Sequence, residues 1–578
     1  MATLCLTMIV RDEEAMLGGC LASVAGIVDE VVVVDTGSRD GTMAIARAAG
    51  ATVLEEPWQD DFSAPRNRAI AASRADWVLV LDADERLTDG ARSALRRALD
   101  ADDFDCGMLP LAHASRLDAA IEDVARGVDR IGDAVHLPRL FRRTPDLRYT
   151  GIVHENVGAW QTAAGRRTKL LPEVQVVHLG AVPDLRQRRA KGLRNVRLLE
   201  RARELHPDDV TVYGYLAHEF LEAGERDKAR EAADRGWTVL LESASVRESL
   251  DTRGAAPARS DTARLVEVPV LRLATARAWL DVGAGDLARA RETLAVAGRL
   301  VREHPDLFFL SGCAAEMEAL RADRADLRRD ALGRALDGYE RALGCAAGVY
   351  LQRFIEGSSG SVAEVRRATM LLLLGRADEA LAAFDGALAA QGSDSTKEVA
   401  PTTSRREAQL GRIEALIAVG DLRRALAEVQ GVLDDRPDGW TLAALAAEAA
   451  GGLDAMAQWI AKAQQVVDAG FVAPHRRERY HDALVALALQ LGKPATAPGP
   501  LGTVARIVAG DAVPTDPPAR GLEDPLVRGM VRRLVRHWLG KGLVTPVERL
   551  VEARAARVLP GIVELTTSVV DELSRPAR

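Results

Sequence analysis

The 578-residue sequence predicts two regions of different fold class, an α/β region with a mostly parallel sheet and a longer all-α region of helical repeats. Up to about residue 180, short β-branched runs alternate with helical stretches, a pattern typical of βαβ units. Beyond residue 190 these runs disappear, and glycines recur at matching positions in helical sequence. We expect four parts: an α/β domain at 1–190, repeats at 191–493, a linker at 494–518 and a helical cap at 519–578.

Four apolar runs predict the first strands of the sheet. Their side chains are apolar almost without interruption, which predicts strands that are covered on both faces. The predicted strands are residues 4–10, 30–35, 52–54 and 77–82. Each intervening stretch begins near a polar or proline residue that suits a helix start. The predicted helices are residues 13–25, 42–49 and 64–73.

Four glycines mark a recurring pattern in the all-α region: Gly224, Gly285, Gly375 and Gly420. Each is followed by alanine five residues on, then by a small or apolar residue four later and another three after that. This spacing resembles the second half of a tetratricopeptide repeat (TPR), in which glycine permits the turn between two closely packed helices. The glycines are 61, 90 and 45 residues apart, so a less regular α-helical solenoid stays open as an alternative.

The end of the chain changes character twice. Residues 494–518 are rich in proline and glycine, which predicts a linker. After it, apolar residues fall on one face of an expected helix, and we expect this segment to cap the repeats. The apolar residues on that face are Leu526, Met530, Leu534 and Leu539.

Composition excludes several classes of partner. The net charge is only −8, and lysine and arginine are scattered, so we expect no binding to nucleic acid or to an anionic membrane. No apolar run approaches the roughly 20 residues that span a bilayer. The 5 cysteines form no Cys-x-x-Cys pair, which favours reduced thiols and a cytoplasmic protein.

The sharpest chemical motif is Asp82-Ala83-Asp84, which ends the fourth predicted strand. Open α/β sheets bind ligands at the carboxyl ends of their strands. Two carboxylates at that edge are costly without a cation, and oxygen ligands suit a divalent ion that carries a diphosphate. We therefore expect Mg²⁺ or Mn²⁺ to be held by Asp82 and Asp84. Asp-x-Asp pairs also arise by chance on charged surfaces, so the surrounding motifs decide whether this pair is a metal site.

Three further blocks give this pair its context. Ile-Val-Arg-Asp-Glu-Glu (9–14) follows the first strand, and Val-Asp-Thr-Gly-Ser-Arg-Asp-Gly-Thr (34–42) follows the second. Pro-Arg-Asn-Arg (65–68) opens the third helix. In this order, over residues 3–180, the blocks and the Asp-x-Asp pair resemble family 2 glycosyltransferases. The resemblance implies a GT-A fold, which is Rossmann-like, and a nucleotide-sugar donor.

The resemblance also implies where the donor lies, namely across the ends of the first, second and fourth strands. UDP is the leading nucleotide, but Thr36 stands where the family often has an aspartate that contacts the base, so the base stays open. The residues implied to contact the nucleotide sugar are Val10, Arg11, Glu13, Asp35, Ser38, Arg66, Asn67, Asp82 and Ala83.

Residues 139–142 and 149–155 resemble the acceptor-side block of a bacterial subgroup with TPR-like C-terminal regions, which includes the sublancin-type peptide glycosyltransferases. Inverting transfer needs one general base, and Glu155 is the first candidate and His154 the second. His178 follows an apolar strand, where many GT-A enzymes have a further metal ligand. A structural role for either histidine is the alternative.

The helical region suggests an acceptor. TPR-like arrays bind extended peptides, so we expect either a peptide or protein acceptor or self-association into a homo-oligomer. Two other functions stay open: a non-catalytic TPR scaffold with a degenerate transferase domain, and a nucleotidyltransferase. Nucleotidyltransferases usually carry a glycine-rich loop after the first strand, whereas this chain has Arg-Asp-Glu-Glu at 11–14.

Overall fold

The computed structural model forms two compact units, Met1–Leu307 with Ala347–Glu356, and Phe308–Ala346 with Gly357–Arg578. The sheet and the first helices belong to the same unit. The residues that the structure describes are 2–163, 165–180, 182, 191–243, 246–247, 250, 261–345, 352–355, 358–392, 403–433, 437–449, 457–462, 474–495, 499–513, 515, 517–518 and 520–574.

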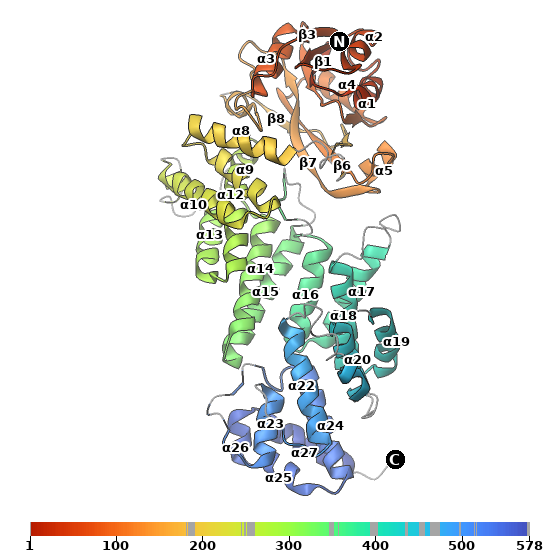
Figure 1. Ribbon diagram of the computed structural model, residues 1–578, viewed down its shortest axis with the longest axis vertical. Helices are drawn as coiled ribbons and strands as arrows, with labels where there is room; N and C mark the ends of the chain where they lie inside the picture. Colours follow the sequence, from red (N-terminus) through yellow and green to blue (C-terminus); the bar gives the residue numbers. More distant parts are fainter. Residues whose placement is uncertain are drawn as a thin grey trace. The chain divides into compact units, whose positions relative to one another are not determined.

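The first half of the sheet is parallel, as predicted, with strand order β3-β2-β1-β4. Figure 1 shows β1 and β3 of this half near the N-terminus. Its strands are β1 (Leu4–Val10), β2 (Glu30–Asp35), β3 (Thr52–Glu55) and β4 (Trp77–Val80). Its helices are α1 (Glu14–Ser23), α2 (Thr42–Ala48) and α3 (Ser63–Ala72). Leu6, Val33 and Leu79 are fully buried, as expected for strands that are covered on both faces.

The second half of the sheet is mixed, and its order continues β4-β7-β6-β9-β5, with β8 paired to β6. Strand β7 runs antiparallel to both β4 and β6. This pairing places the Asp-x-Asp turn after β4 beside the middle of β7. The elements here are β5 (Glu85–Leu87), α4 (Ala91–Ala101), β6 (Cys106–Ala114), α5 (Ile121–Arg126), β7 (Arg130–Arg142), α6 (Gly158–Gln161), β8 (Thr168–Leu170) and β9 (Val176–His178).

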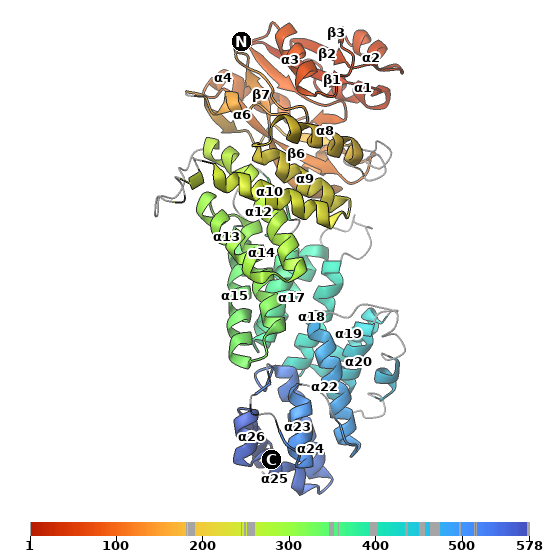
Figure 2. The ribbon, with the colours of Figure 1, turned by 60° about the vertical axis from the view of Figure 1, so that its left-hand side comes forward.

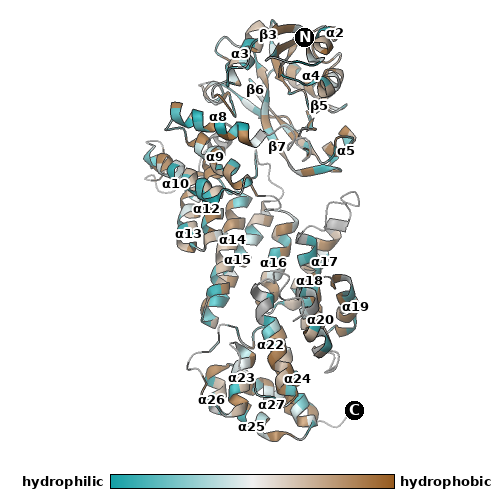
Figure 3. Cartoon of the chain, viewed as in Figure 1, coloured by the Kyte–Doolittle hydropathy of each residue, from teal (hydrophilic) through white to brown (hydrophobic). Residues whose placement is uncertain are grey.

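Helical hairpins follow the sheet in the first unit (Figure 2). Gly224 and Gly285 have φ of +77° and +80° at the turns between paired helices, where glycine avoids the strain of a side chain. Ala229 and Ala290, five residues later, are fully buried, which confirms the predicted close packing. The helices are α8 (Lys191–Leu205), α9 (Val210–Glu222), α10 (Arg226–Glu242), α12 (Asp261–Ala284), α13 (Leu287–Leu300) and α14 (Pro305–Arg321), and α14 continues into the second unit. Figure 3 shows α8 as largely hydrophilic.

The second unit repeats the same turn at Gly375 and Gly420, with φ of +81° and +88°. Its elements are α15 (Ala325–Gly344), α16 (Ser361–Leu373), α17 (Ala377–Gly392), α18 (Thr403–Val419), α19 (Leu422–Val429), η1 (Gln430–Val432), α20 (Pro437–Ala449), α22 (Pro474–Gln490), α23 (Pro500–Ala509), α24 (Pro525–Gly540), α25 (Val544–Leu550), α26 (Ala553–Val558) and α27 (Ile562–Ser574). Along the described part of the chain, no helix combines the length and apolar character that crossing a bilayer requires.

Residues 494–518, predicted as a linker, contain the helix α23. Leu501, Val504 and Ile507 of this helix are buried in the core of the second unit. Residues 500–509 of the segment are therefore helical and packed, because their apolar side chains recur at helical spacing between flanking prolines and glycines. In the following cap, Leu526, Met530 and Leu534 of α24 are buried, as their spacing predicts, and Leu539 is partly buried. The boundaries at 190 and 518 stay predictions.

Candidate active site

A cavity of about 1050 Å³ lies at the carboxyl ends of β1 and β4. The sheet domain and the following helices of the first unit build most of its wall, and Gln352 adds to it. The sheet domain contributes Val10, Arg11, Glu13, Thr36, Arg66, Asp82, Ala83, Asp84, Arg139, His154, Glu155 and His178, among others. The helices α8, α9 and α12 contribute Arg194, Asn195, Thr211, Tyr215, Val268 and Pro269. Ten of the thirteen predicted site residues thus line one cavity, and the exceptions in the described wall are Asp35, Ser38 and Asn67.

Hydrogen bonds join the loops after β1 and β2 into one edge of the cavity. The backbone N–H of Asp12 donates to Ser38 Oγ over 2.9 Å, and the N–H of Glu13 donates to Thr42 Oγ1 over 2.8 Å. In return, the N–H of Arg39 donates to Asp12 Oδ1 over 2.7 Å. Ser38 therefore supports the loop that presents the residues from Val10 to Glu13.

Asp35 ends β2 and is 2% exposed. Its Oδ1 accepts hydrogen bonds from the backbone N–H groups of Gly37 and Ser38, at 2.9 and 2.8 Å. Its Oδ2 is buried and has no hydrogen-bond partner among the residues that the structure describes. Because buried carboxylate oxygens are nearly always hydrogen-bonded, this oxygen is available to a ligand that donates a hydrogen bond.

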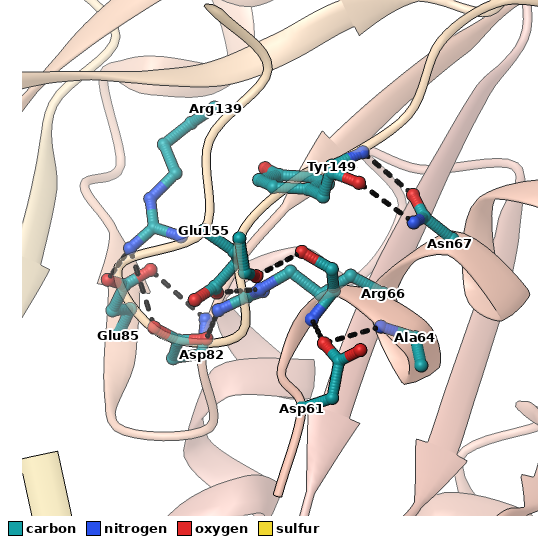
Figure 4. A network of polar contacts seen from close by, with 11 residues as sticks. Asp61, Ala64, Arg66, Asn67, Asp82, Glu85, Arg139, Tyr149 and Glu155 are labelled. Atoms are coloured by element: carbon teal, nitrogen blue, oxygen red, sulfur yellow. Dashed lines mark hydrogen bonds and ion pairs between the residues drawn. The ribbon is translucent and has the colours of Figure 1, made fainter. Parts of the chain in front are cut away.

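Two arginines and three carboxylates meet beside the Asp-x-Asp turn (Figure 4). We call Arg66, Asp82, Glu85, Arg139 and Glu155 the carboxylate–arginine cluster. Arg66 of α3 donates from Nε to Glu155 Oε1 over 2.5 Å and from Nη2 to Asp82 Oδ1 over 3.0 Å. Arg139 of β7 donates from Nη2 to Glu85 Oε1 over 2.5 Å and reaches Asp82 Oδ2 at 3.4 Å. Both guanidinium groups are nearly buried and adjoin the cavity.

Burial and neighbouring charges shift the pKa values of Asp82 and Glu85 in opposite directions. Burial alone would raise the pKa of Asp82, but the charges of Arg66 and Arg139 outweigh it and hold this pKa well below its ordinary value. Burial raises the pKa of Glu85 to about 7, against the opposing charge of Arg139 and with a further rise from Asp82. Asp82 is therefore ionised at neutral pH, whereas Glu85 titrates near neutrality.

The sequence motifs predict no role for Glu85, and they place Arg139 only within the block 139–142 that resembles an acceptor side. Glu85 Oε2 accepts a hydrogen bond from the backbone N–H of Asp82 over 3.1 Å and so fixes the Asp-x-Asp turn. The position of Glu85 directly after the Asp-x-Asp motif is the one sequence feature that could have indicated this role. Arg139 reaches the turn because Leu140 of β7 pairs with Leu79 of β4. That antiparallel pairing joins distant segments and leaves no local pattern.

Asn67 contacts the backbone of Tyr149 (Figure 4). Its Oδ1 accepts from the N–H of Tyr149 over 2.7 Å, and its Nδ2 donates to the carbonyl oxygen of Tyr149 over 3.0 Å. The Tyr149 ring lies 5.6 Å from the Arg66 guanidinium carbon. Asn67 thus holds the segment that supports Arg66.

Asp84 and His178 lie together at the ends of β4 and β9. Asp84 is 5% exposed, and its Oδ1 is 3.6 Å from His178 Nε2. The other nitrogen of this imidazole, Nδ1, is 2.9 Å from Nδ1 of His113. Gly180 makes this approach possible, since a Cβ on Gly180 would stand 2.0 Å from Asp84 Oδ2.

This donor set suits a divalent ion that also binds substrate. No group of three His, Cys, Asp or Glu side chains within the described ranges is arranged to hold a metal. Mg²⁺ and similar ions are commonly bound by one or two carboxylates together with substrate phosphates, so a complete protein cage is not required. Asp84 and His178 fit such a partial site, while Asp82 faces Arg66 and Arg139.

His154 lies apart from the carboxylate–arginine cluster although it precedes Glu155. Its ring stacks on Tyr215 of α9, with centroids 3.6 Å apart and planes 4° from parallel. Burial, followed by the charges of Arg272 and Arg194, lowers the pKa of His154 to about 3. This imidazole is therefore neutral at physiological pH.

Comparison with known proteins agrees with this architecture. Residues 5–153 match the model of glycosyl transferase family 2. A TPR repeat-containing protein of Synechococcus elongatus is 38% identical over 243 residues, which are 41% of this chain and 57% of that protein. The SPbeta prophage-derived glycosyltransferase SunS of Bacillus subtilis is 24% identical over 212 residues, 36% of this chain and 46% of that protein. The chain thus spans about half the length of these relatives.

Among solved structures, glucosyl-3-phosphoglycerate synthase of Mycobacterium tuberculosis, in complex with Mn²⁺, UDP-glucose and phosphoglyceric acid, is 23% identical. The match covers 19% of this chain and 44% of that chain, with a TM-score of 0.17, and it adds no argument. The fold, the strand-end motifs and the family match agree on one conclusion. Residues 5–153 match the family 2 glycosyltransferase model and fold into an α/β sheet domain, and TPR-like helices follow it.

Proposed function

We propose that this protein is a metal-dependent, inverting glycosyltransferase that uses a nucleotide diphosphate sugar, with a UDP-sugar as the leading donor. The acceptor is a peptide or protein side chain. One observation carries the proposal: a single cavity brings the Asp-x-Asp pair, two arginines and Glu155 together at the carboxyl ends of β1 and β4. The family 2 domain supports transfer from a nucleotide sugar.

The nucleoside binds along the edge formed by the loops after β1 and β2. Val10, Arg11 and Glu13 line the cavity there, and Asp35 has a buried carboxylate oxygen that suits a base N–H or a ribose hydroxyl. Ser38 keeps this edge in place through Asp12. Ala83 lines the cavity between the two aspartates, where the diphosphate passes toward the sugar.

The diphosphate would lie near Asp84 and His178, which would hold Mg²⁺ or Mn²⁺ together with Asp82. When bound, the cation neutralises the charge that develops on the leaving diphosphate. Arg66 adds positive charge at the same place, and its buried Nη1 has no hydrogen-bond partner in the described structure. A diphosphate would compete with Asp82 and Glu155 for this guanidinium group.

Glu155 acts as the general base. It accepts the proton of an acceptor hydroxyl or thiol while the acceptor atom bonds to the anomeric carbon. The bond from that carbon to the diphosphate oxygen breaks, and its electron pair leaves with the nucleoside diphosphate. A single displacement of this kind inverts the anomeric configuration. His154 is the second candidate and also lines the cavity, but burial lowers its pKa to about 3, which makes its imidazole a weak proton acceptor.

Two features support this proposal over its rivals. Asp82, Asp84 and Glu155 all line the cavity, which favours catalysis over a scaffold with a degenerate domain. The loop after β1 contains Arg11 and Glu13 and no glycine, which favours a glycosyltransferase over a nucleotidyltransferase.

A donor screen tests the proposal. Nucleotide sugars are incubated with the full chain and Mn²⁺ or Mg²⁺, with and without candidate peptides, and release of nucleoside diphosphate is measured. We expect chelation by EDTA to abolish turnover and Asp84→Asn to lower it by about a hundredfold or more. Asp103→Asn is the matched control, because Asp103 is half exposed and paired with Lys169 outside the cavity. Full turnover by Asp84→Asn or in EDTA contradicts the metal assignment, and no turnover with any donor contradicts catalysis.

A further inference from the structure

The segment that carries Glu155, residues 150–156, is a closed loop that is anchored to α3. Thr150 and Asn156 exchange backbone hydrogen bonds of 2.9 and 3.0 Å, which close its base. The N–H of Phe62 donates to the carbonyl oxygen of Ile152 over 3.0 Å. Ser63 Oγ donates to the carbonyl oxygen of Gly151 over 2.5 Å. We call this segment the 150–156 loop.

The tip of this loop is in an unfavourable backbone conformation. His154 has φ of +49°, in the left-handed region that non-glycine residues seldom adopt. Such a conformation persists where the surroundings hold it. Two contacts with α9 in the helical region hold His154: its ring stacks in parallel on Tyr215, and its Nε2 lies 3.9 Å from Glu219 Oε1.

Tyr215 is in turn fixed from its other side. The Arg272 guanidinium carbon lies 3.8 Å from the Tyr215 ring centroid and 4.7 Å from that of Phe354. Arg272 also donates from Nη2 to Gln352 Oε1 over 3.1 Å. We call His154, Tyr215, Arg272 and Phe354 the aromatic–arginine stack. Gly214 makes room for it, since a Cβ there would stand 3.2 Å from Arg272 Cδ.

The helix α8 contacts the neighbouring β3–α3 loop in a similar way. Arg197 donates to Asp60 Oδ1 over 2.6 Å, and the Arg194 guanidinium carbon lies 5.3 Å from the Phe62 ring centroid. Phe62 is the residue whose N–H holds Ile152. Two helices of the repeat region therefore act on the 150–156 loop, α9 directly and α8 through Phe62.

We propose that Tyr215 is a positioning residue for Glu155, and that the first TPR-like helices form part of the catalytic apparatus. Without the stack, His154 can return to an ordinary backbone conformation, and Glu155 then shifts away from Arg66. A displacement of about 1 Å in a catalytic group can lower the rate about a hundredfold. The inference rests on the proposed role of Glu155 as the base.

Hydrogen–deuterium exchange on the full chain tests the mechanical half of this proposal without any substrate. Tyr215→Ala should raise exchange in residues 150–157 by about fivefold or more, because the loop loses its support. Tyr215→Phe keeps the ring and should leave exchange within about twofold of the unaltered chain. Trp279→Ala, which removes a half-exposed ring from α12, is the control and should change nothing in this loop. Unchanged exchange in Tyr215→Ala overturns the proposal.

Kinetics with a donor from the screen test the catalytic half. Tyr215→Ala should lower kcat about 10- to 100-fold while KM for the donor stays within about twofold, and Tyr215→Phe should restore kcat. A raised KM with unchanged kcat, or equal losses in the two variants, overturns the proposal. If the unaltered chain turns over no donor, that result contradicts the proposed function instead. The exchange experiment then still shows whether the aromatic–arginine stack holds the 150–156 loop.

Discussion

Two of the buried groups of arginine and carboxylate side chains in the described residues, one from each compact unit, differ in what surrounds them. The carboxylate–arginine cluster adjoins a cavity of about 1050 Å³. In the second unit, Glu414 of α18 accepts from Arg476 Nε over 2.7 Å and from Arg479 Nη1 over 2.5 Å. These three side chains, the α18–α22 cluster, are at most 2% exposed. Their ion pairs join two helices within a core.

The difference teaches that burial and ion pairing alone do not identify an active site. The charges of Glu414 and Glu407 raise the pKa of Arg476 against the effect of burial, just as arginines depress the pKa of Asp82. Perturbed pKa values therefore occur in both places. Of these two groups, the carboxylate–arginine cluster lines the cavity of about 1050 Å³, so its loss should affect catalysis more than folding.

The largest expected effect is on turnover. Glu155→Gln removes the proposed base and should lower kcat about 10²- to 10⁴-fold. Its melting temperature should stay close to that of the unaltered chain, since Arg66 keeps its contact with Asp82. Nucleoside diphosphate release and thermal melts measure the two quantities. Glu173→Gln, at an exposed pair with Arg97, is the matched control. Normal kcat in Glu155→Gln would remove Glu155 from the mechanism and leave His154 as the candidate.

The second effect is on folding. Glu414→Gln leaves Arg476 and Arg479 buried with less counter-charge, and breaking such a pair costs about 3–5 kcal/mol. Because the chain has two compact units, we expect denaturant to unfold it in two transitions. The loss of stability should appear only in the transition of the second unit, which contains Glu414. Donor turnover per folded molecule should not change. If Glu414→Gln instead lowers kcat while stability is kept, the contrast between the clusters fails.

The smallest expected effect is on an exposed ion pair, which serves as a reference for the two buried groups. Arg324 and Asp326 form an ion pair of 2.8 Å, but their side chains are 62% and 64% exposed. Solvent screens such pairs, so Arg324→Ala should change the free energy of unfolding by less than about 1 kcal/mol and leave kcat unaltered. The same denaturant titration measures it. A loss of unfolding free energy as large as that from Glu414→Gln would mean that burial does not determine how much an ion pair stabilises this chain.

Sequence patterns predicted the features of the fold that depend on neighbouring residues in the chain. The strands β1 to β4 lie within two residues of their predicted bounds because continuous apolar runs bury both faces of a strand. The turns at Gly224, Gly285, Gly375 and Gly420 all have positive φ, as the repeat spacing predicts. The Asp-x-Asp pair lies at a strand end, as predicted. These features each depend on a few neighbouring residues.

Features that depend on pairing between distant segments were not predicted. Arg139 reaches Asp82 through the antiparallel pairing of β7 with β4, and Tyr215 reaches His154 from a different region of the chain. Asn67, predicted to bind the donor, is occupied with the Tyr149 backbone. The helix α23 was missed because its flanking prolines and glycines dominate the composition of 494–518.

The shared wall of the cavity limits how the two regions can be recombined. A chimera that joins a different family 2 domain to these helices at residue 190 keeps a continuous chain, but its loop needs a ring in the place of His154 to meet Tyr215. The helices and the 150–156 loop must therefore be inherited, or engineered, as a matched pair. Swapping the repeats to change the acceptor should keep α8, α9 and α12 together with Gln352 and Phe354, because Gln352 lines the cavity and Phe354 belongs to the aromatic–arginine stack.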